Sequence, residues 1–212
     1  MLQDFPEVES FTRYNSYGTP IIRYEGKNYM EEHMALVDSS FFKIFSFNLL
    51  KGDKEKVLNA PYQVVISQSS AKKVFGNVDP IGKMIKVGTD TTYYKVSGIM
   101  EDLPENSSFE ADIFASFLSS RRANDGNWLS NSFETYVLLK EGTNPDELDQ
   151  KFMPLLEKYV GPLLEQYLNV SLQEFFDQGN LYYYKLQPFL EIHLDPSISH
   201  EVKPATDPRY LY

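Results

Sequence analysis

The feature that most constrains the fold is a strand, a helix and a hairpin that follow one another in the middle of the chain. The apolar run 63–66 is typical of a buried strand. It leads into a helical stretch for which Ser67 is the predicted N-cap and Gly76 the predicted glycine just past the C-terminus. Residues 83–87 and 93–100 then predict a β-hairpin. Strands and a helix mixed at this short range are typical of the α+β class.

Period-2 alternation predicts more strands on both sides of this unit. Residues 8–14 alternate between apolar and polar or small side chains, which is the signal of a half-buried strand. Residues 21–24 and 28–30 predict a hairpin, because Gly26 between them can supply the positive φ of a tight turn. Residues 135–139 predict another strand.

Capping residues mark the predicted helices. The polar run 38–40 offers a capping side chain to a short aromatic helix at 41–45. Asn144 is the predicted N-cap of a later helix, with Pro145 at its first position and Glu147 completing a capping box.

The rest of the chain predicts further helix and a final strand. Pro154 lies inside the apolar periodicity that continues the helix after Asn144, so we expect that helix to kink or end early. A helix is predicted over 163–176, ending near Gly179, and the aromatic run 181–186 predicts a last strand. No fixed-period repeat or heptad run is present. Together the elements predict an α+β fold with a mixed sheet and packed helices.

Length and composition bound the chemistry. A chain of 212 residues can bury about 70% of the surface that it exposes when unfolded. We therefore expect one domain, or two intimate subdomains, without the need for a disulfide. The lack of cysteine excludes thiol nucleophiles and cysteine zinc sites. The formal charge of −10 argues against nucleic acid and anionic membrane surfaces as partners.

No stretch reaches the roughly 18 apolar residues that a membrane span requires. The start at Met1 also lacks the basic and apolar regions of a signal peptide. We therefore expect the chain as given to be soluble.

Two motifs suggest chemistry that their context does not support. Five residues separate Gly76 from Gly82, where a phosphate-binding P-loop has four, and Met84 replaces the magnesium-binding Ser or Thr. We interpret this stretch as a turn. Ser69 and Lys72 form a Ser-x-x-Lys pattern, but its companion motifs Ser-Asp-Asn and Lys-Thr-Gly are absent from the sequence. An exposed lysine on a solvated face is the preferred interpretation.

Histidine offers no metal site by spacing. His33, His193 and His200 are dispersed, and no His-Glu-x-x-His is present. Alternation would put Glu191, His193 and Asp195 on one side of a strand, which we interpret as a surface cluster or a structural hydrogen bond. The sequence assigns no catalytic, cofactor-binding or metal-binding residue.

Acidic and aromatic clusters are also interpreted as structural. The acidic pairs at 31–32 and 101–102 are expected to be solvated. The aromatic clusters at 41–42, 175–176 and 182–184 could line a groove for an apolar or peptide cargo. Packing in the core and on the sheet is the preferred interpretation.

Several segments, taken in order, resemble the MacB-like periplasmic core domain of MacB/FtsX-type permeases. These segments are 37–45, 64–67, 71–76, 79–83 and 96–99. Two later segments, 136–142 and 192–194, are similar to the closing part of the family, particularly in its Bacteroidetes-type permeases. The resemblance covers nearly the whole chain.

The resemblance implies a domain that lies between the first and second transmembrane helices of an ABC transporter permease, from which this chain is excised. It implies a discontinuous α+β subdomain at 1–49 and 126–212, with a smaller β-rich subdomain inserted at 50–125, the Porter and Sabre arrangement. Members of the family extrude peptides or drugs, move lipoproteins or regulate wall hydrolases. Their extracytoplasmic domain contacts cargo or partner proteins and performs no bond chemistry.

On this basis we expect a non-catalytic domain on the periplasmic side of the bacterial inner membrane, without cofactor. The implied partners are the transmembrane helices of the same permease, a cytoplasmic ABC ATPase, and a periplasmic partner protein or a peptide or lipoprotein cargo. The full-length permease is expected to be dimeric, and the isolated domain monomeric or weakly dimeric. Two alternatives stay open: a free-standing secreted ligand-binding protein, and a small serine hydrolase that uses Ser69 and Lys72.

Overall fold

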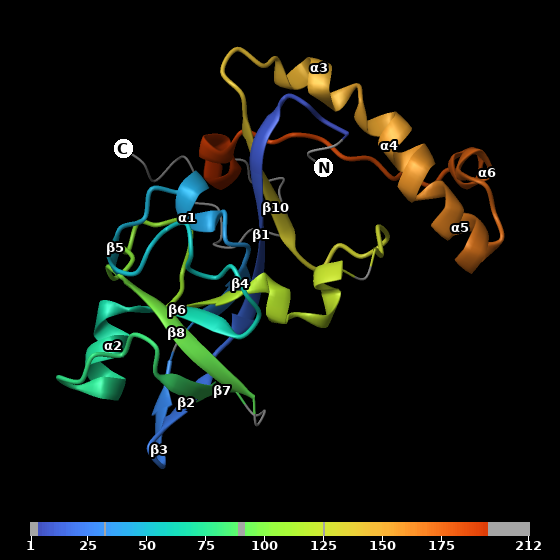
Figure 1. Cartoon of the computed structure of the whole chain (residues 1–212). Coiled ribbons are helices and arrows are strands. Elements are labelled where there is room, and N and C mark those ends of the chain that lie inside the picture. The colour runs from blue at the N-terminus through green and yellow to red at the C-terminus, as the bar shows by residue number, and fades with distance from the viewer. Residues whose placement is uncertain (1–3, 32, 89–91, 125, 195–212) are drawn as a thin grey trace.

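One mixed sheet organises the chain. A computed structural model describes residues 4–31, 33–88, 92–124 and 126–194 (Figure 1). Within these ranges the strands are β1 Val8–Gly18, β2 Ile21–Tyr24, β3 Lys27–Met30, β4 Met34–Val37, β5 Leu49–Lys51, β6 Gln63–Ser67, β7 Met84–Val87, β8 Tyr93–Met100, β9 Ile113–Ser116 and β10 Glu134–Leu139. Their order is β10-β1-β4-β9-β6-β8-β7-β2-β3, and β5 pairs with β8 outside this path. The pairs β4 with β9 and β6 with β8 are parallel, and the others are antiparallel.

The helices fall into two groups. They are α1 Phe41–Ile44, α2 Gln68–Phe75, α3 Pro145–Asp149, α4 Phe152–Tyr159, α5 Gly161–Leu168 and α6 Leu172–Asp177, with 3-10 helices η1 Phe117–Ser119, η2 Arg121–Asn124 and η3 Phe189–Leu194. In Figure 1, α1 and α2 lie against the sheet, whereas α3 to α6 form a row beyond β1 and β10. None of the helices in the described ranges combines the length and apolarity that crossing a bilayer requires. The α+β prediction, with a mixed sheet and packed helices, is confirmed.

Strand β1 changes its partner halfway along its length. Its first half pairs with β10, from Val8 opposite Leu139 to Tyr14 opposite Glu134. Its second half pairs with β4, beginning with Tyr14 opposite Val37. The strand therefore connects the β10 edge to the centre of the sheet.

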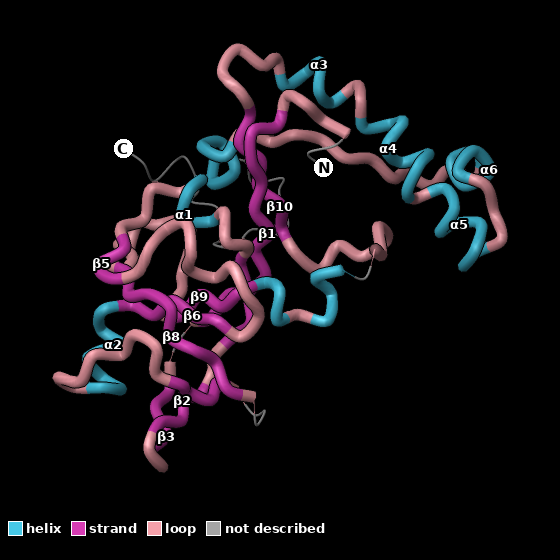
Figure 2. Tube along the Cα trace, viewed as in Figure 1, coloured by secondary structure: helices cyan, strands magenta, loops and turns pink. Residues whose placement is uncertain are grey.

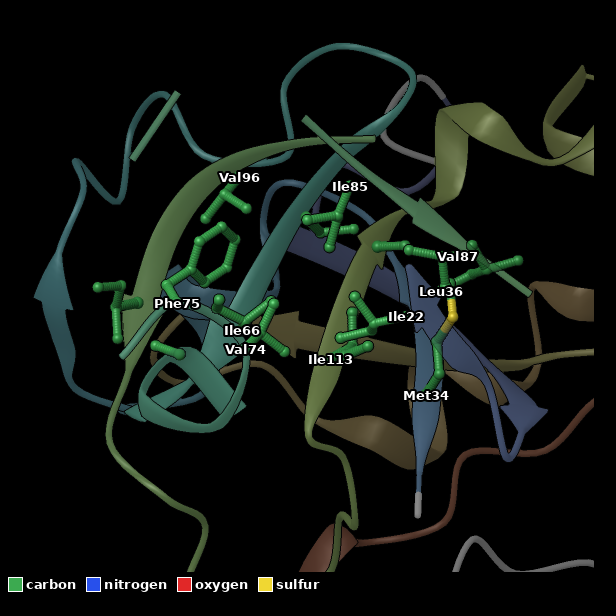
Figure 3. Close-up of a cluster of buried hydrophobic side chains, with 14 of the residues drawn as sticks. Ile22, Met34, Leu36, Ile66, Val74, Phe75, Ile85, Val87, Val96 and Ile113 are labelled. Carbon is green, nitrogen blue, oxygen red and sulfur yellow. The ribbon is translucent and has the colours of Figure 1, made fainter. Parts of the chain in front are cut away.

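The central strands bury side chains on both faces of the sheet. On β6, Val64 and Ile66 point into one apolar core and Val65 into the other. Figure 3 shows the first core, where Val74 and Phe75 of α2 cover Ile66. The second core is aromatic and surrounds α1.

Phe41 is the centre of the aromatic core. Its ring centroid lies 4.6 Å from that of Phe114 and 5.2 Å from that of Phe109, and its side chain is fully buried. Tyr14 of β1 also packs on Phe109, at 5.2 Å. Aromatic rings thus join α1, β1 and β9 into one body, at about 0.5–1.5 kcal/mol per pair beyond area burial.

Local signals place most elements where the sequence predicts them. The Oγ of Ser67 accepts the N–H of Ser70 (3.1 Å) at the start of α2, and Gly76 ends this helix with φ +60°. Asn144 accepts the N–H of Asp146 (3.1 Å) and so caps α3.

Pro154 ends the α3 helix early as expected, because its ring would clash with the preceding turn of a continuous helix. It is tolerated in the first turn of α4, where its missing N–H has no helical acceptor anyway.

Two capping predictions are wrong in their chemistry. Ser40 precedes α1 without a capping bond, because its hydroxyl donates to the carbonyl of Phe11 (2.5 Å) on β1. Glu147 accepts a bond from the side-chain amide of Asn144 (3.2 Å) instead of from the backbone. A complete capping box is instead found at the start of α6, where it is formed by Ser171 and Glu174.

Two element predictions are also wrong. The stretch 163–176 is two helices, α5 and α6, because Asn169 adopts left-handed φ (+55°) and ends the first. The run 181–186 is extended but forms no strand ladder, and Figure 2 shows it as loop. Its side chains do alternate between exposed and half-buried. The sequence also does not predict β4, β5 and β9.

The predicted division into 1–49 with 126–212, and an inserted 50–125, stays a prediction. Strands from 50–125 form one block inside the sheet, joined to the other part on both sides, since β4 pairs with β9 and β2 pairs with β7. Any such subdomains therefore share a continuous hydrogen-bond network.

Alanine at two glycines is expected to have opposite effects. An added Cβ at Gly98 of β8 would lie 3.0 Å from Val57 Cγ1 and 3.2 Å from the carbonyl of Lys51. We expect Gly98→Ala to lower the free energy of unfolding by roughly 1–3 kcal/mol, because this packed core has no room. At Gly161 of α5 the nearest atoms lie at 3.9 Å. There alanine should leave stability unchanged or raise it by up to about 1 kcal/mol.

Urea unfolding of both variants, followed by circular dichroism, measures the two effects. A Gly98→Ala variant as stable as the parent chain would contradict the close approach of β5 and β8.

Candidate functional site

A cavity of about 650 Å³ lies between the β1–β10 ribbon and the row of helices. It is lined by Phe5, Val8, Phe11, Arg13, Arg122, Ala123, Asn124, Gly126, Asn127, Trp128, Ser130, Asn131, Phe133, Thr135, Val137, Leu148, Phe152, Leu155, Tyr184, Lys185 and Leu186. Three parts of the chain that are distant in sequence therefore meet here: the first strand, the segment around residue 128, and the end of the described chain.

The ribbon formed by β1 and β10 provides the floor of the cavity. Phe11 stands opposite Val137, and Arg13 stands opposite Thr135. These paired side chains share one face of the two strands, because residues two apart point the same way. The alternate residues Thr12, Tyr14 and Tyr136 occupy the other face, where both tyrosines pack on the aromatic core. One ribbon therefore has a core face and a cavity face.

Helices α3 and α4 form one wall through their own small core. The rings of Phe5 and Phe152 meet edge to face at 5.4 Å, and both side chains are buried. Leu148 and Leu155 complete this contact. The wall therefore packs on the N-terminal segment and on the β1–β10 ribbon, through Val8, Val137 and Leu139, in a cluster separate from the two larger cores of the sheet.

Trp128 packs against the same helical wall. Its ring stacks on Tyr159 of α4, with centroids 4.5 Å apart and an angle of 11°. Its carbonyl accepts hydrogen bonds from the hydroxyls of Tyr182 (2.7 Å) and Tyr184 (3.2 Å). Burial raises the pKa of Tyr184, which therefore stays a neutral donor. The aromatic run near the C-terminus thus serves to clamp this segment.

Arg13 is fixed at the inner end of the cavity. Its Nε donates to Asp38 Oδ2 (2.9 Å) and its Nη2 to Asp38 Oδ1 (2.7 Å). Its Nη1 donates to the carbonyl of Ala123 (2.8 Å), and the guanidinium lies 4.0 Å from the ring centroid of Phe117. The guanidinium of Arg13 is therefore engaged in contacts within the protein, and these contacts link β1 to η2.

Two ion pairs attach α3 and α4 to the chain before β1. Lys158 donates to Asp4 (2.6 Å), and Lys151 pairs with Glu7. The hydrogen bonds from these lysines lower the pKa of both carboxyl groups. The N-terminal segment is therefore held by charge as well as by Phe5.

Ser69 of the Ser-x-x-Lys pattern bonds to Asp102. The Oγ of Ser69 donates to Asp102 Oδ2 (2.6 Å), and its N–H donates to Oδ1 (2.9 Å). Burial raises the pKa of Asp102, but the bonds from Ser69 outweigh it and leave the pKa below its ordinary value. Asp102 is thus a carboxylate cap at the N-terminus of α2, and Lys72 is exposed, as expected.

The phosphate-loop resemblance is confirmed as a turn. The N–H groups of Gly82 and Lys83 donate to the carbonyls of Val96 and Pro80, at 2.8 and 3.0 Å. These donors are therefore occupied by the turn and by β8.

One acidic residue was expected in solvent and is buried. Glu31 is 3% exposed, accepts the hydroxyl of Ser70 (2.7 Å), and pairs with Lys73 (3.2 Å). The prediction for Glu31 is wrong, because α2 covers this carboxylate with a hydroxyl and an ammonium group. Glu32 lies outside the described residues. Glu101 is exposed, as expected.

Histidine forms no metal cluster in the part of the chain that the structure describes. His33 is half exposed, with its Nε2 3.7 Å from Glu110. The side chain of His193 and the whole of Asp195 and His200 lie outside what is described. Of the aromatic clusters, 41–42 is core, as preferred, and Phe175 packs beside the helices. Tyr184 of the third cluster lines the cavity, and a groove for cargo there stays a prediction.

Sequence reasoning missed the floor and one wall of the cavity. The single tryptophan at 128 and the alternation at 8–14 were the available signals. The contact of Arg13 with Ala123 joins residues 110 positions apart, and no local pattern contains that pairing.

Solved structures that are similar to this chain include the following three. A domain of a proposed permease from Porphyromonas gingivalis matches with TM-score 0.72 and 27% identity, over 89% of this chain and 76% of that one. The periplasmic region of MacB from Actinobacillus actinomycetemcomitans matches with TM-score 0.49 and 15% identity, over 85% and 80%. The extracellular domain of the ABC-type transporter YknZ from Gram-positive bacteria matches with TM-score 0.46 and 15% identity, over 78% and 79%.

A search of curated protein sequences found no match. A family model described as the MacB-like periplasmic core domain matches residues 1–155. This range contains the whole sheet and most of the cavity lining. It covers well over half of the chain, and the resemblance noted in the sequence is confirmed: the chain belongs to the MacB-like periplasmic core domain family of ABC transporter permeases.

Proposed function

We propose that this domain is a non-catalytic transmitter, which contacts cargo or a partner protein and carries ATP-driven motion of transmembrane helices to that contact. The observation that supports this most is the attachment of the N-terminal segment. Asp4 and Glu7 are bound to α4 and to the residue just before it, Phe5 is buried between α3 and α4, and β1 then enters the sheet. A displacement applied there reaches the helices and the sheet together.

The double pairing of β1 extends this argument. Because β1 bonds to β10 and to β4, a force along the strand is shared by both. Cooperative packing of the two cores opposes local deformation. The domain would therefore move as one body and change the surface that it presents.

The partners follow from this role. We propose a location on the periplasmic side of the bacterial inner membrane, tethered by transmembrane helices of the same permease and driven by a cytoplasmic ABC ATPase. Within a dimeric permease, two such domains would face a periplasmic protein or a peptide or lipoprotein cargo. The chain's net charge of −10 does not favour nucleic acid.

The cavity also fits a secreted ligand-binding protein, the second candidate. A gene that continues into apolar segments of about 20 residues on both sides of this chain would favour the transmitter, and a signal peptide directly before it would favour the secreted protein.

Spin labels test whether the domain moves as one body. The chain contains no cysteine, so Lys95→Cys in β8 and Glu165→Cys in α5 place two labels at exposed sites. In the full permease with its ATPase in liposomes, we expect the distance between these labels to be the same with and without ATP. With one Glu165→Cys label on each copy of the dimeric permease, we expect the distance between the labels of the two domains to change when ATP is added.

A label distance within one domain that changes on ATP binding would contradict rigid transmission. An unchanged distance between the two domains would contradict transmission itself. Non-hydrolysable ATP analogue serves as the control for binding without turnover.

Ser69→Ala separates the capping role from catalysis. We expect the variant to lose roughly 0.5–1.5 kcal/mol of unfolding free energy, because one hydrogen bond to Asp102 is removed. Coupled ATP hydrolysis by the full permease should equal that of the parent. A panel of ester and peptide substrates, hydrolysed by the parent chain but not by Ser69→Ala, would support the hydrolase alternative and refute the non-catalytic role.

A further inference from the structure

The cavity carries a charge opposite to that of the chain. The sequence holds 30 acidic and 20 basic residues. Among the lining residues that the structure describes there are three cations, Arg13, Arg122 and Lys185, and no Asp or Glu. The charged side chains among the described lining residues are thus all cationic, and a cationic rim favours an anionic ligand.

Two of these cations are free to act on a ligand. Arg13 is neutralised by Asp38 and bonded to Ala123. Arg122 and Lys185 are exposed, and neither forms an ion pair with any residue in the described ranges. They come from η2 and from the segment after α6, which meet at this cavity.

The interior of the cavity is apolar. Phe11 and Val137 form the floor, Phe133 and Trp128 flank it, and all four side chains are half-buried. The volume of about 650 Å³ falls in the range of roughly 300–1,000 Å³ that is typical of small-molecule sites.

We propose that this cavity binds a single-chain anionic amphiphile, with its hydrocarbon chain on Phe11, Val137 and Trp128 and its head group near Arg122 and Lys185. The proposal rests on the proposed function only in taking this molecule as cargo. A hydrocarbon chain forms no hydrogen bonds, so it needs no polar partner in a cavity lined mainly by apolar side chains. An extended peptide would bring an N–H and a C=O per residue, each of which needs a partner.

Trp128 makes the binding measurable. It is the only tryptophan in the chain and it lines the cavity. Its fluorescence in the 212-residue chain can be followed during titration with dodecyl phosphate below its micelle concentration. We expect saturable binding, with decyl phosphate weaker by about 15-fold, because each buried methylene contributes about fourfold. Dodecyltrimethylammonium, with the same chain and the opposite charge, should bind much more weakly.

Matched variants locate the site. Arg122→Gln and Lys185→Gln should each weaken dodecyl phosphate about two- to fivefold, as expected for exposed charge pairs. Arg121→Gln is the control, since this neighbouring exposed arginine does not line the cavity. Thr135→Phe, at an exposed position of the floor, should fill the recess and reduce affinity more than tenfold. Circular dichroism confirms that each variant is folded.

Equal binding of the phosphate and the ammonium compound, or equal effects of Arg121→Gln and Arg122→Gln, would overturn the assignment of the head group. Unchanged affinity in Thr135→Phe would overturn the cavity as the site. Saturable quenching by an acidic peptide of eight residues, with none by dodecyl phosphate, would overturn the amphiphile in favour of a peptide. These titrations need no ATPase, so their failure leaves the transmitter role standing, and failure of the label experiment leaves the cavity proposal standing.

Discussion

The rest of the structure depends on the change of partner along β1. Its first half is an edge ribbon with β10, and its second half enters the centre of the sheet beside β4. Arg13 lies at this transition and bonds through both sides of its guanidinium to Asp38, just past β4, and to Ala123. Strand β1 therefore borders both the aromatic core and the cavity: Tyr14 packs in the core, and Arg13 lines the cavity.

Half-buried strands could be predicted from their alternation and the buried β6 from its apolar run, whereas the short buried strands β4 and β9 could not be predicted. The strand at 8–14 and the hairpin at 21–30 alternate because one face meets water. Strands β4 and β9 are buried on both faces, so Met34–Val37 and Ile113–Ser116 show no period. The run 181–186 has the right alternation and no ladder, since tyrosine hydroxyls bonded to Trp128 hold it in place of backbone bonds.

The candidate site was less predictable than the fold for a physical reason. Caps such as Ser67 and Asn144 act over two or three residues, so a local pattern contains both partners. The cavity is built from contacts between Phe5 and Phe152, and between Trp128 and Tyr159, whose partners are distant in sequence. Resemblance to a family supplies the architecture of such contacts, but the sign of charge around the recess follows from the lining residues of this chain.

The separate small cores of the helices have an evolutionary consequence. The wall formed by α3 and α4 is ordered by Phe5, Leu148 and Phe152, and none of these belongs to either core of the sheet. Substitutions there reshape the recess without changing a residue of the two larger cores of the sheet. Selection can therefore diversify what the domain recognises independently of what keeps it folded, so one scaffold can serve permeases that handle different molecules.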